Sequence, residues 1–110
     1  MGKILNLEKI NSIKRSKIEN GMKYIDTMNG SEPVISRVVV FGSAITDNCT
    51  ENSDIDICLF TEYDNTNEKY RVIRGHLMDE MDDVCDILKY SRLNSSFKSQ
   101  IEKGVVVYEL

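Results

Sequence analysis

Residues 37–60 read RVVVFGSAITDNCTENSDIDICLF, and this stretch decides the fold. Its first five residues, RVVVF, are mostly apolar and follow a turn-forming cluster at residues 29–33, so they predict a buried strand. The run DIDICLF at residues 54–60 predicts a second strand. A Gly-Ser pair ends the first strand, and residues 44–53 form a polar connection. We therefore expect two strands of a sheet on either side of this connection.

Outside this stretch, helical and strand patterns alternate along the chain. Apolar residues recur at three- and four-residue steps over residues 7–28 and 68–81, so each range predicts a helix, and Gly21 is expected to kink or divide the first one. The other expected elements are a turn at residues 61–67, a strand at 84–90, a helix at 93–102 and a strand at 105–108. This pattern predicts an α/β (α+β) fold in which a small mixed β-sheet is backed by helices.

Length and charge restrict the domain organisation and the classes of partner. The 110 residues fit one domain, and a composition with 41% hydrophobic and 29% charged residues is typical of a globular chain. Residues 1–40 carry seven basic and four acidic groups, whereas the rest of the chain carries seven basic and fourteen acidic groups. The acidic part argues against wide contact with a nucleic-acid backbone, so we expect no nucleic acid as a partner. Concentrated carboxylates are, however, what hard divalent cations require.

The cysteines and the apolar runs indicate the compartment. Cys49, Cys58 and Cys85 form neither a CxxC motif nor an even set, which fits neither a disulfide framework nor a zinc site. Cys58 and Cys85 lie inside apolar runs, so buried reduced thiols are expected, which favours a cytoplasmic protein. The sequence has no signal-peptide pattern and no apolar stretch near the ~20 residues that cross a bilayer. We therefore expect neither export nor a membrane span.

Two aspartates occupy the start of the second expected strand, where this residue type is disfavoured. Asp54 and Asp56 are two positions apart, so their side chains share one face of the strand, with Cα atoms roughly 6.5–7 Å apart. Each carboxylate tends to raise the pKa of the other, and a bound dication would remove that conflict. The alternative is a strand edge with two solvated acids, which is common for an isolated Asp-x-Asp.

A third acid repeats this anomaly, and a Gly-Ser turn adds a second kind of signal. Asp86 lies inside an apolar run, and if the second and third strands are neighbours, three carboxylates converge on one patch. Metal-bound phosphate chemistry gives a reason for such convergence. Gly42 lets the backbone approach a ligand closely, and Ser43 offers a hydroxyl and an N–H at the N-terminus of a helix expected from Ala44. Alone, a Gly-Ser pair after a strand is simply a turn.

Together, the residues FGSAITDNCTENSDID at positions 41–56 resemble the signature of the polymerase-beta nucleotidyltransferase superfamily, which is Gly-Ser, ten residues, then Asp-x-Asp. The resemblance is closest to the minimal nucleotidyltransferases and extends to the ending LNSSFKSQIEKGVVVYEL. It implies a single domain over residues 1–110, with an N-terminal helical segment at 1–30 and a catalytic core at 37–110. The chain departs from the pattern at residues 44–47, AITD, where relatives usually have a basic residue and a glycine, and it lacks the proline often found before Ser-Asp-x-Asp.

The resemblance also implies roles for the site residues. Gly42 and Ser43 would bind the nucleotide through its triphosphate, and Asp54, Asp56 and Asp86 would be the catalytic carboxylates that bind Mg²⁺ or Mn²⁺. Asp86 would also help to deprotonate the acceptor hydroxyl. The implied reaction is metal-dependent transfer of a nucleoside monophosphate from an NTP, with ATP as the expected substrate. It proceeds by in-line attack on the α-phosphorus and release of pyrophosphate.

Three functions from different classes stay open at this stage. The resemblance to the minimal group implies an antitoxin-like enzyme of a toxin–antitoxin system that adenylylates a HEPN-family toxin, which suits a chain this short because the acceptor must come in trans. The second function is a small-molecule nucleotidyltransferase of the aminoglycoside type, against which the missing helical domain argues. The third is a non-catalytic nucleotide-binding antitoxin module, against which the three aspartates argue. The sequence leaves the oligomeric state open.

The remaining polar residues are interpreted as surface. The lysines between the apolar positions of the first helix predict a solvated face. The acidic run at residues 79–83 predicts a solvated turn, with a second cation site or a docking face for a basic partner as the sharper alternative. His76, the only histidine in the sequence, is expected at or near the surface.

Overall fold

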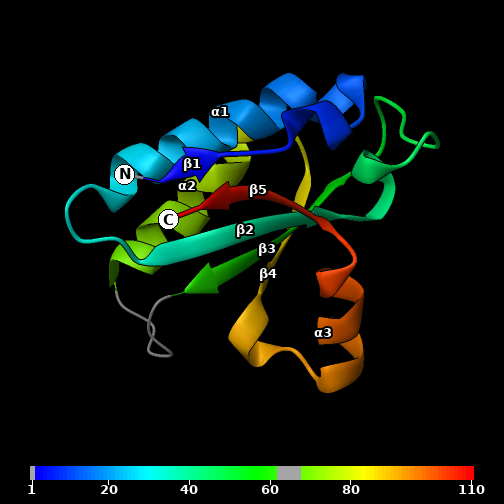
Figure 1. Ribbon diagram of the computed structural model, residues 1–110. Coiled ribbons are helices and arrows are strands. Elements are labelled where there is room, and N and C mark those ends of the chain that lie inside the picture. The colour runs from blue at the N-terminus through cyan, green and yellow to red at the C-terminus, as the bar shows by residue number, and fades with distance from the viewer. Residues whose placement is uncertain (1, 62–67) are drawn as a thin grey trace.

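The computed structural model describes residues 2–61 and 68–110. It contains a five-stranded sheet with helices on both faces (Figure 1). The strands are β1 Lys3–Ile4, β2 Ile35–Phe41, β3 Ile55–Thr61, β4 Cys85–Lys89 and β5 Val105–Glu109. The helices are α1 Ser12–Asn29, α2 Glu68–Met81 and α3 Ser95–Glu102, with 3-10 turns η1 Leu7–Lys9, η2 Gly42–Ile45 and η3 Tyr90–Arg92. The turn expected at residues 61–67 falls outside the described ranges except for its first residue. No helix in the described ranges is long and apolar enough to cross a membrane.

The strand order in the sheet is β1-β5-β2-β3-β4. β3 and β4 run parallel, whereas the other neighbouring strands run antiparallel. The predicted mixed sheet backed by helices is therefore confirmed. The sequence does not predict β1, because a strand of two residues carries too little periodicity to be distinguished from a loop. β1 pairs with β5, and this pairing places the two ends of the chain side by side.

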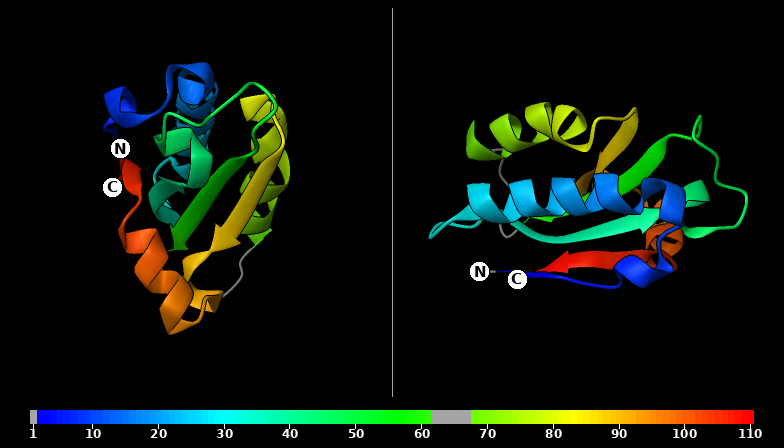
Figure 2. Two further views of the ribbon diagram at one scale, coloured as in Figure 1. Left: turned by 90° about the vertical axis from the view of Figure 1, so that its right-hand side faces the viewer. Right: turned by 90° about the horizontal axis from the view of Figure 1, so that it is seen from above.

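α1 and α2 lie together over one face of the sheet (Figure 2). Their apolar residues turn toward the strands, and strand alternation directs every second strand residue toward the helices. The fully buried side chains of this core include Ile18, Met22, Ile25, Val38, Val40, Ile57, Leu59, Ile73 and Leu77. Burial of each such side chain contributes about 1.5–3 kcal/mol relative to exposure. This layer is the larger of the two apolar clusters and holds the sheet to both long helices.

α1 begins later than the sequence pattern predicts, and it is not divided. Residues 7–9 form a separate 3-10 turn, and Asn11 caps α1 by accepting a hydrogen bond from the Ile13 N–H at 3.0 Å. Gly21 is buried within a continuous helix, where a Cβ would lie 2.5 Å from Cγ of Met81 on α2. The glycine therefore permits close approach of the two helices, and the expected division of the helix at Gly21 is wrong.

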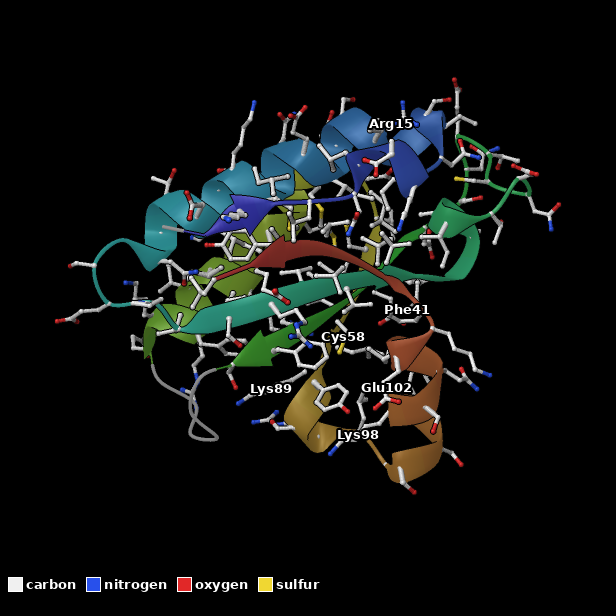
Figure 3. The ribbon with its side chains drawn as sticks, in the orientation of Figure 1. Arg15, Phe41, Cys58, Lys89, Lys98 and Glu102 are labelled. Atoms are coloured by element: carbon white, nitrogen blue, oxygen red, sulfur yellow. The ribbon has the colours of Figure 1, made fainter. Side chains whose placement is uncertain are left out.

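The opposite face of the sheet carries α3 and a smaller apolar cluster (Figure 3). Phe41 at the end of β2 meets Phe97 of α3 edge to face, with ring centroids 6.2 Å apart. Phe60 of β3 stacks on Tyr90, with ring centroids 4.1 Å apart. Cys58 is fully buried in this cluster, and burial raises the pKa of its thiol to about 12. The protonated thiol has no role as a nucleophile at neutral pH.

The observed bounds of β4 and α3 differ by a few residues from the predicted ranges, and local contacts explain the differences. β4 ends at Lys89 because Tyr90 enters η3, so the strand expected at residues 84–90 is slightly shorter than predicted. α3 begins at Ser95, later than predicted, because the side chain of Asn94 caps its first turn. The helix predicted at residues 68–81 is confirmed as α2.

Candidate functional site

Asp56 and Asp86 lie side by side on the parallel pair β3 and β4. They are partners in the register of the two strands, and because neighbouring strands lie about 4.8 Å apart, such partners point to the same face of the sheet. Ile55 and Ile57 are buried under the long helices, so Asp56 points to the opposite face, the one that carries α3. Asp86 is exposed and Asp56 is half-buried. The two acids therefore occupy adjacent positions on a surface that a ligand can reach.

Asp54 extends this pair at the start of β3. It directly precedes the first residue of the strand and is exposed. Burial is the main cause that raises the pKa of Asp56, and the negative charges of Asp86 and Asp54 raise this pKa further. The ionised form of Asp56 is thus disfavoured by its surroundings, and a cation beside it would relieve the repulsion.

Gly42 brings the end of β2 against the Asp56 carboxylate. Phe41, the last residue of β2, pairs with Asp56, and Gly42 follows with a φ of 73°, which side-chain-bearing residues rarely adopt. A Cβ at this position would overlap Oδ2 of Asp56. Ser43 follows in η2, which lies against β3, and its carbonyl accepts hydrogen bonds from the N–H and the hydroxyl of Thr46. The Gly-Ser turn and the acid-bearing strand are therefore in direct contact.

The connection after Gly42 contains one 3-10 turn and no α-helix. η2 covers Gly42–Ile45, and Thr46 returns to an extended conformation. The helix expected from Ala44 as an anion-binding N-terminus is therefore wrong, because a turn this short lacks the aligned peptide dipoles of a longer helix. An anion at this turn would be met instead by the hydroxyl and the backbone N–H of Ser43.

The donor set suits Mg²⁺ or Mn²⁺ that arrives with a nucleotide. Across residues 2–61 and 68–110, no group of three or more His, Cys, Asp and Glu side chains is arranged to hold a metal ion by itself. Mg²⁺ is usually bound through one or two carboxylates plus substrate phosphates rather than by an all-protein cage. Adjacent carboxylates beside the exposed Gly42-Ser43 turn fit this mode of binding. The metal site of three carboxylates stays a prediction.

A buried ion pair that the sequence patterns miss anchors the segments leading into the acid-bearing strands. Lys14 on α1 is 1% exposed, and its Nζ lies 2.6 Å from Oδ2 of Asp83, in the turn before β4. The same Nζ donates to the carbonyl of Glu51, before β3, at 3.1 Å. The predictions that Lys14 belongs to a solvated face and Asp83 to a solvated turn are wrong. The missed signal is spacing, because Lys14 lies four residues before Ile18, on the buried stripe of α1.

A comparison with known protein families gives the decisive match. The family described as polymerase beta, nucleotidyltransferase matches residues 23–110, a range that includes the Gly-Ser turn and all three aspartates. The chain belongs to this family. Nucleotidyl transfer is therefore the activity of the domain. No curated protein sequence matches the chain.

Solved structures with a similar fold include chains of toxin–antitoxin complexes. A chain in a mutant of the toxin-antitoxin MntA-HpeT has a TM-score of 0.61 and 18% identity, covering 83% of this chain and 74% of that chain. A chain in a toxin-antitoxin structure with AMP-PNP has a TM-score of 0.61 and 19% identity, covering 81% and 73%. A chain in the complex of tri-AMPylated Shewanella oneidensis HEPN toxin with MNT antitoxin has a TM-score of 0.57 and 19% identity, covering 86% and 73%. Identities this low establish the shared fold alone.

Proposed function

We propose that this protein transfers a nucleoside monophosphate from ATP to a hydroxyl of a partner protein, in a reaction that depends on Mg²⁺ or Mn²⁺. One observation carries the proposal. This chain belongs to the nucleotidyltransferase family, and in it Asp56 and Asp86 are register partners on neighbouring strands while Gly42 packs against Asp56. Paired carboxylates beside an exposed backbone turn suit the joint binding of a dication and a triphosphate.

Within this proposal each site residue has its own task. Gly42 and Ser43 receive the triphosphate, because glycine lets the phosphates approach the backbone and serine adds a hydroxyl donor. Asp54, Asp56 and Asp86 hold the dication, which when bound offsets the negative charge on the phosphates. Residues 44–47 add no positive side chain after the Gly-Ser turn, and the dication held by the carboxylates would supply positive charge to the phosphates.

The transfer is an in-line displacement at the α-phosphorus. The acceptor oxygen forms a bond to that phosphorus while the bond to the oxygen bridging the α- and β-phosphates breaks, and pyrophosphate leaves with the electron pair. Asp86 accepts the proton of the acceptor hydroxyl, which is a general-base role. Its place next to Asp56 supports this role, because the base must lie beside the metal-binding carboxylates to reach the attacking oxygen.

The proposed acceptor is a partner of the HEPN toxin kind. Similar folds occur in the toxin-antitoxin MntA-HpeT and in a complex whose HEPN toxin is tri-AMPylated. A further similar chain belongs to a toxin-antitoxin structure with AMP-PNP, which supports ATP as the donor. Cys49, Cys58 and Cys85 are free and buried, which supports a reducing, cytoplasmic location.

Incubation of the protein with α-labelled ATP, Mg²⁺ and a candidate HEPN-type partner protein tests the proposal. We expect label on the partner with the wild type, and none with Asp54→Asn/Asp56→Asn. The control is Asp79→Asn/Asp82→Asn, which removes two exposed acids from the end of α2 and the turn after it and should leave transfer unchanged. Transfer by the Asp54/Asp56 variant at the wild-type rate would remove these residues from the site. A partner that the wild type neutralises without labelling it would identify the chain as a non-catalytic antitoxin module.

A further inference from the structure

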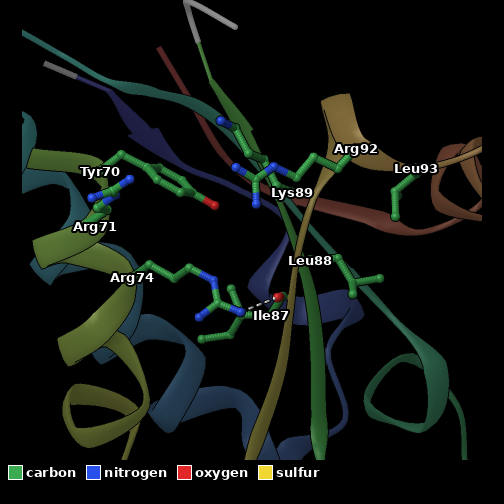
Figure 4. Close-up of a pocket in the computed structure, with 8 residues that line it drawn as sticks. All are labelled: Tyr70, Arg71, Arg74, Ile87, Leu88, Lys89, Arg92 and Leu93. Carbon is green, nitrogen blue, oxygen red and sulfur yellow. Dashed lines mark hydrogen bonds between the residues drawn. The ribbon is translucent and has the colours of Figure 1, made fainter. Parts of the chain in front are cut away.

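A basic pocket lies at the edge of the sheet, between α2, β4 and η3 (Figure 4). Its volume is about 440 Å³, within the range of about 300–1,000 Å³ that is common for small-molecule sites. Four cationic side chains line it, namely Arg71, Arg74, Lys89 and Arg92. Four positive charges in one pocket are unexpected in a chain of net charge -4.

These four cations lack anionic partners in the described parts of the chain. The ion pairs found within residues 2–61 and 68–110 involve Lys14, Lys17, Lys23 and Arg37 instead. Arg74 donates a hydrogen bond to the carbonyl of Ile87 at 2.9 Å, and its side chain also hydrogen-bonds Tyr70, which together hold its guanidinium between α2 and β4. A guanidinium has five N–H donors, so several stay available to a ligand.

Lys89 is the strongest indication of a missing anion. It is 8% exposed and lies on the α2 side of β4, with Nζ 4.9 Å from the centroid of the Tyr70 ring. Burial of an ammonium group is costly unless an anion compensates, and the aromatic ring compensates only in part. Figure 4 shows Arg92 extending from the turn after β4 toward Tyr70, so the charges of Lys89 and Arg92 lie together at one end of the pocket.

The cations of the pocket and the carboxylates lie on opposite sides of β4, although Leu88 and Leu93, which also line the pocket, belong to the apolar cluster on the α3 face. Ile87 and Lys89 point toward α2, whereas Asp86 points to the face that carries α3, because successive strand residues alternate between faces. The cations therefore do not belong to the nucleotide-transfer site described above. Their occupant must be a separate ligand.

We propose that this pocket is a second anion site, which binds the phosphate groups of a small polyphosphorylated molecule without a metal. Arginine guanidinium groups match pairs of phosphate oxygens, which favours phosphate over a single carboxylate. Several converging positive charges require a ligand with several negative charges, such as pyrophosphate or the polyphosphate chain of a nucleotide. The acidic chain and the limited volume of the pocket favour a small ligand over a nucleic-acid strand. The site is independent of the transfer reaction.

Isothermal titration of the full-length protein with pyrophosphate and with tripolyphosphate, in EDTA, tests this site. Arg71→Gln/Arg92→Gln removes two exposed cations and should weaken binding at least about tenfold, the loss expected when a hydrogen bond to a charged group is removed. Lys3→Gln/Lys9→Gln makes the same change in net charge on the far side of the molecule and should leave the affinity unchanged. Asp54→Asn/Asp56→Asn should retain binding, and the NMR signal of the Arg74 side chain should shift when either anion is added.

Four results would each overturn the proposal. The first is that neither anion gives a binding heat or shifts the Arg74 signal, and the second is that Lys3→Gln/Lys9→Gln weakens anion binding as much as Arg71→Gln/Arg92→Gln does. The third is that Asp54→Asn/Asp56→Asn loses anion binding. The fourth is that the protein binds a single-stranded RNA oligomer but not pyrophosphate. The second result would indicate general charge attraction, and the third would place the anion on the other face of the sheet. The fourth would make the surface a nucleic-acid site.

Discussion

The carboxylate of Asp56 occupies the space in which a side chain of Gly42 would begin. Antiparallel pairing of Phe41 with Asp56 sets this contact, because it aligns the end of β2 with the start of β3. The turn proposed to receive the triphosphate and the carboxylate proposed to hold the dication are therefore one packed unit. A change at either residue should displace the other.

Gly42→Ala should destabilise the protein by about 1–2 kcal/mol through its backbone alone, the penalty for a side-chain-bearing residue in the left-handed region. The φ of 73° is the cause, and the overlap of the new Cβ with Asp56 adds to it. Because the carboxylate must move, binding of ATP with Mg²⁺ should also weaken. Urea unfolding measures the first effect, and titration with ATP and Mg²⁺ measures the second.

Substitutions at two other glycines distinguish backbone strain from the overlap of a new Cβ with neighbouring atoms. Gly30 has a φ of 53°, and the nearest atom to its Cβ would be 3.9 Å away, so Gly30→Ala tests strain alone. Gly75 on α2 has nothing within 4 Å, so Gly75→Ala should stabilise the helix by about 0.5–1 kcal/mol. Neither control should alter nucleotide binding. If Gly42→Ala binds ATP with Mg²⁺ as tightly as the wild type does, the contact with Asp56 has no functional weight.

The local pattern predicts the strands, but it does not predict which residues pair. Alternation identifies the face of Asp56 and that of Asp86, whereas their register depends on how α2 connects β3 to β4 in space. The same limit hides the basic pocket, because its cations come from α2, β4 and η3. One local signal is present, since Lys89 lies at the end of an apolar strand, the same anomaly that identifies Asp86. The ten-residue spacing after Gly42-Ser43 is recognisable because it lies within one continuous stretch of sequence.

Without nucleotide, Asp56→Asn should stabilise the protein at neutral pH. Burial and the charges of Asp86 and Asp54 raise the pKa of Asp56 in the folded state, so its ionisation opposes folding. This loss of stability is present above the folded pKa and disappears as the pH falls to the unfolded value near ~3.9. Melting temperatures across this pH range, compared with those of Asp79→Asn, measure the effect. An unchanged or lower melting temperature at neutral pH would contradict the repulsion among the three acids.

Asp83→Asn should destabilise the protein by about 3–5 kcal/mol, because it leaves the buried ammonium of Lys14 without its charged partner. Burial acts to raise the pKa of Asp83, but hydrogen bonds from Lys14 and the Val84 N–H, with the charges of Lys14 and Lys17, lower it overall. The stabilisation is therefore complete above the unfolded pKa of ~3.9 and is lost as the pH falls through the folded pKa. The difference between wild type and variant in urea unfolding should shrink toward zero on acidification.

Asp26 also makes the free energy of unfolding depend on pH at low pH, but its contribution cancels when wild type and Asp83→Asn are compared. The N–H of Gly2 donates to Asp26 at 2.8 Å, and this bond is the main cause that lowers the pKa of Asp26. It is present in both the wild type and Asp83→Asn, so it does not enter their difference. A difference that stays constant from neutral pH to below the unfolded pKa would show that Asp83 acts through packing and not through its charge.

Asp86→Asn should lower kcat for transfer by about 10²–10⁴-fold, the loss typical when a general base is removed. Asparagine has nearly the same shape, so the pairing of residue 86 with Asp56 should persist, whereas the amide cannot accept the proton of the acceptor hydroxyl. Nucleotide binding should change much less than kcat, because Asp54 and Asp56 still provide carboxylates for the dication. Single-turnover labelling of the partner gives the rate, and titration with a non-hydrolysable ATP analogue and Mg²⁺ gives the affinity. Asp79→Asn, at an exposed position on α2, is the matched control. A full transfer rate in Asp86→Asn would leave Asp54 and Asp56 as a nucleotide-binding pair and would assign the proton of the hydroxyl to another acceptor. If the transfer rate and the nucleotide affinity fall equally, Asp86 is a metal ligand without a separate role as base.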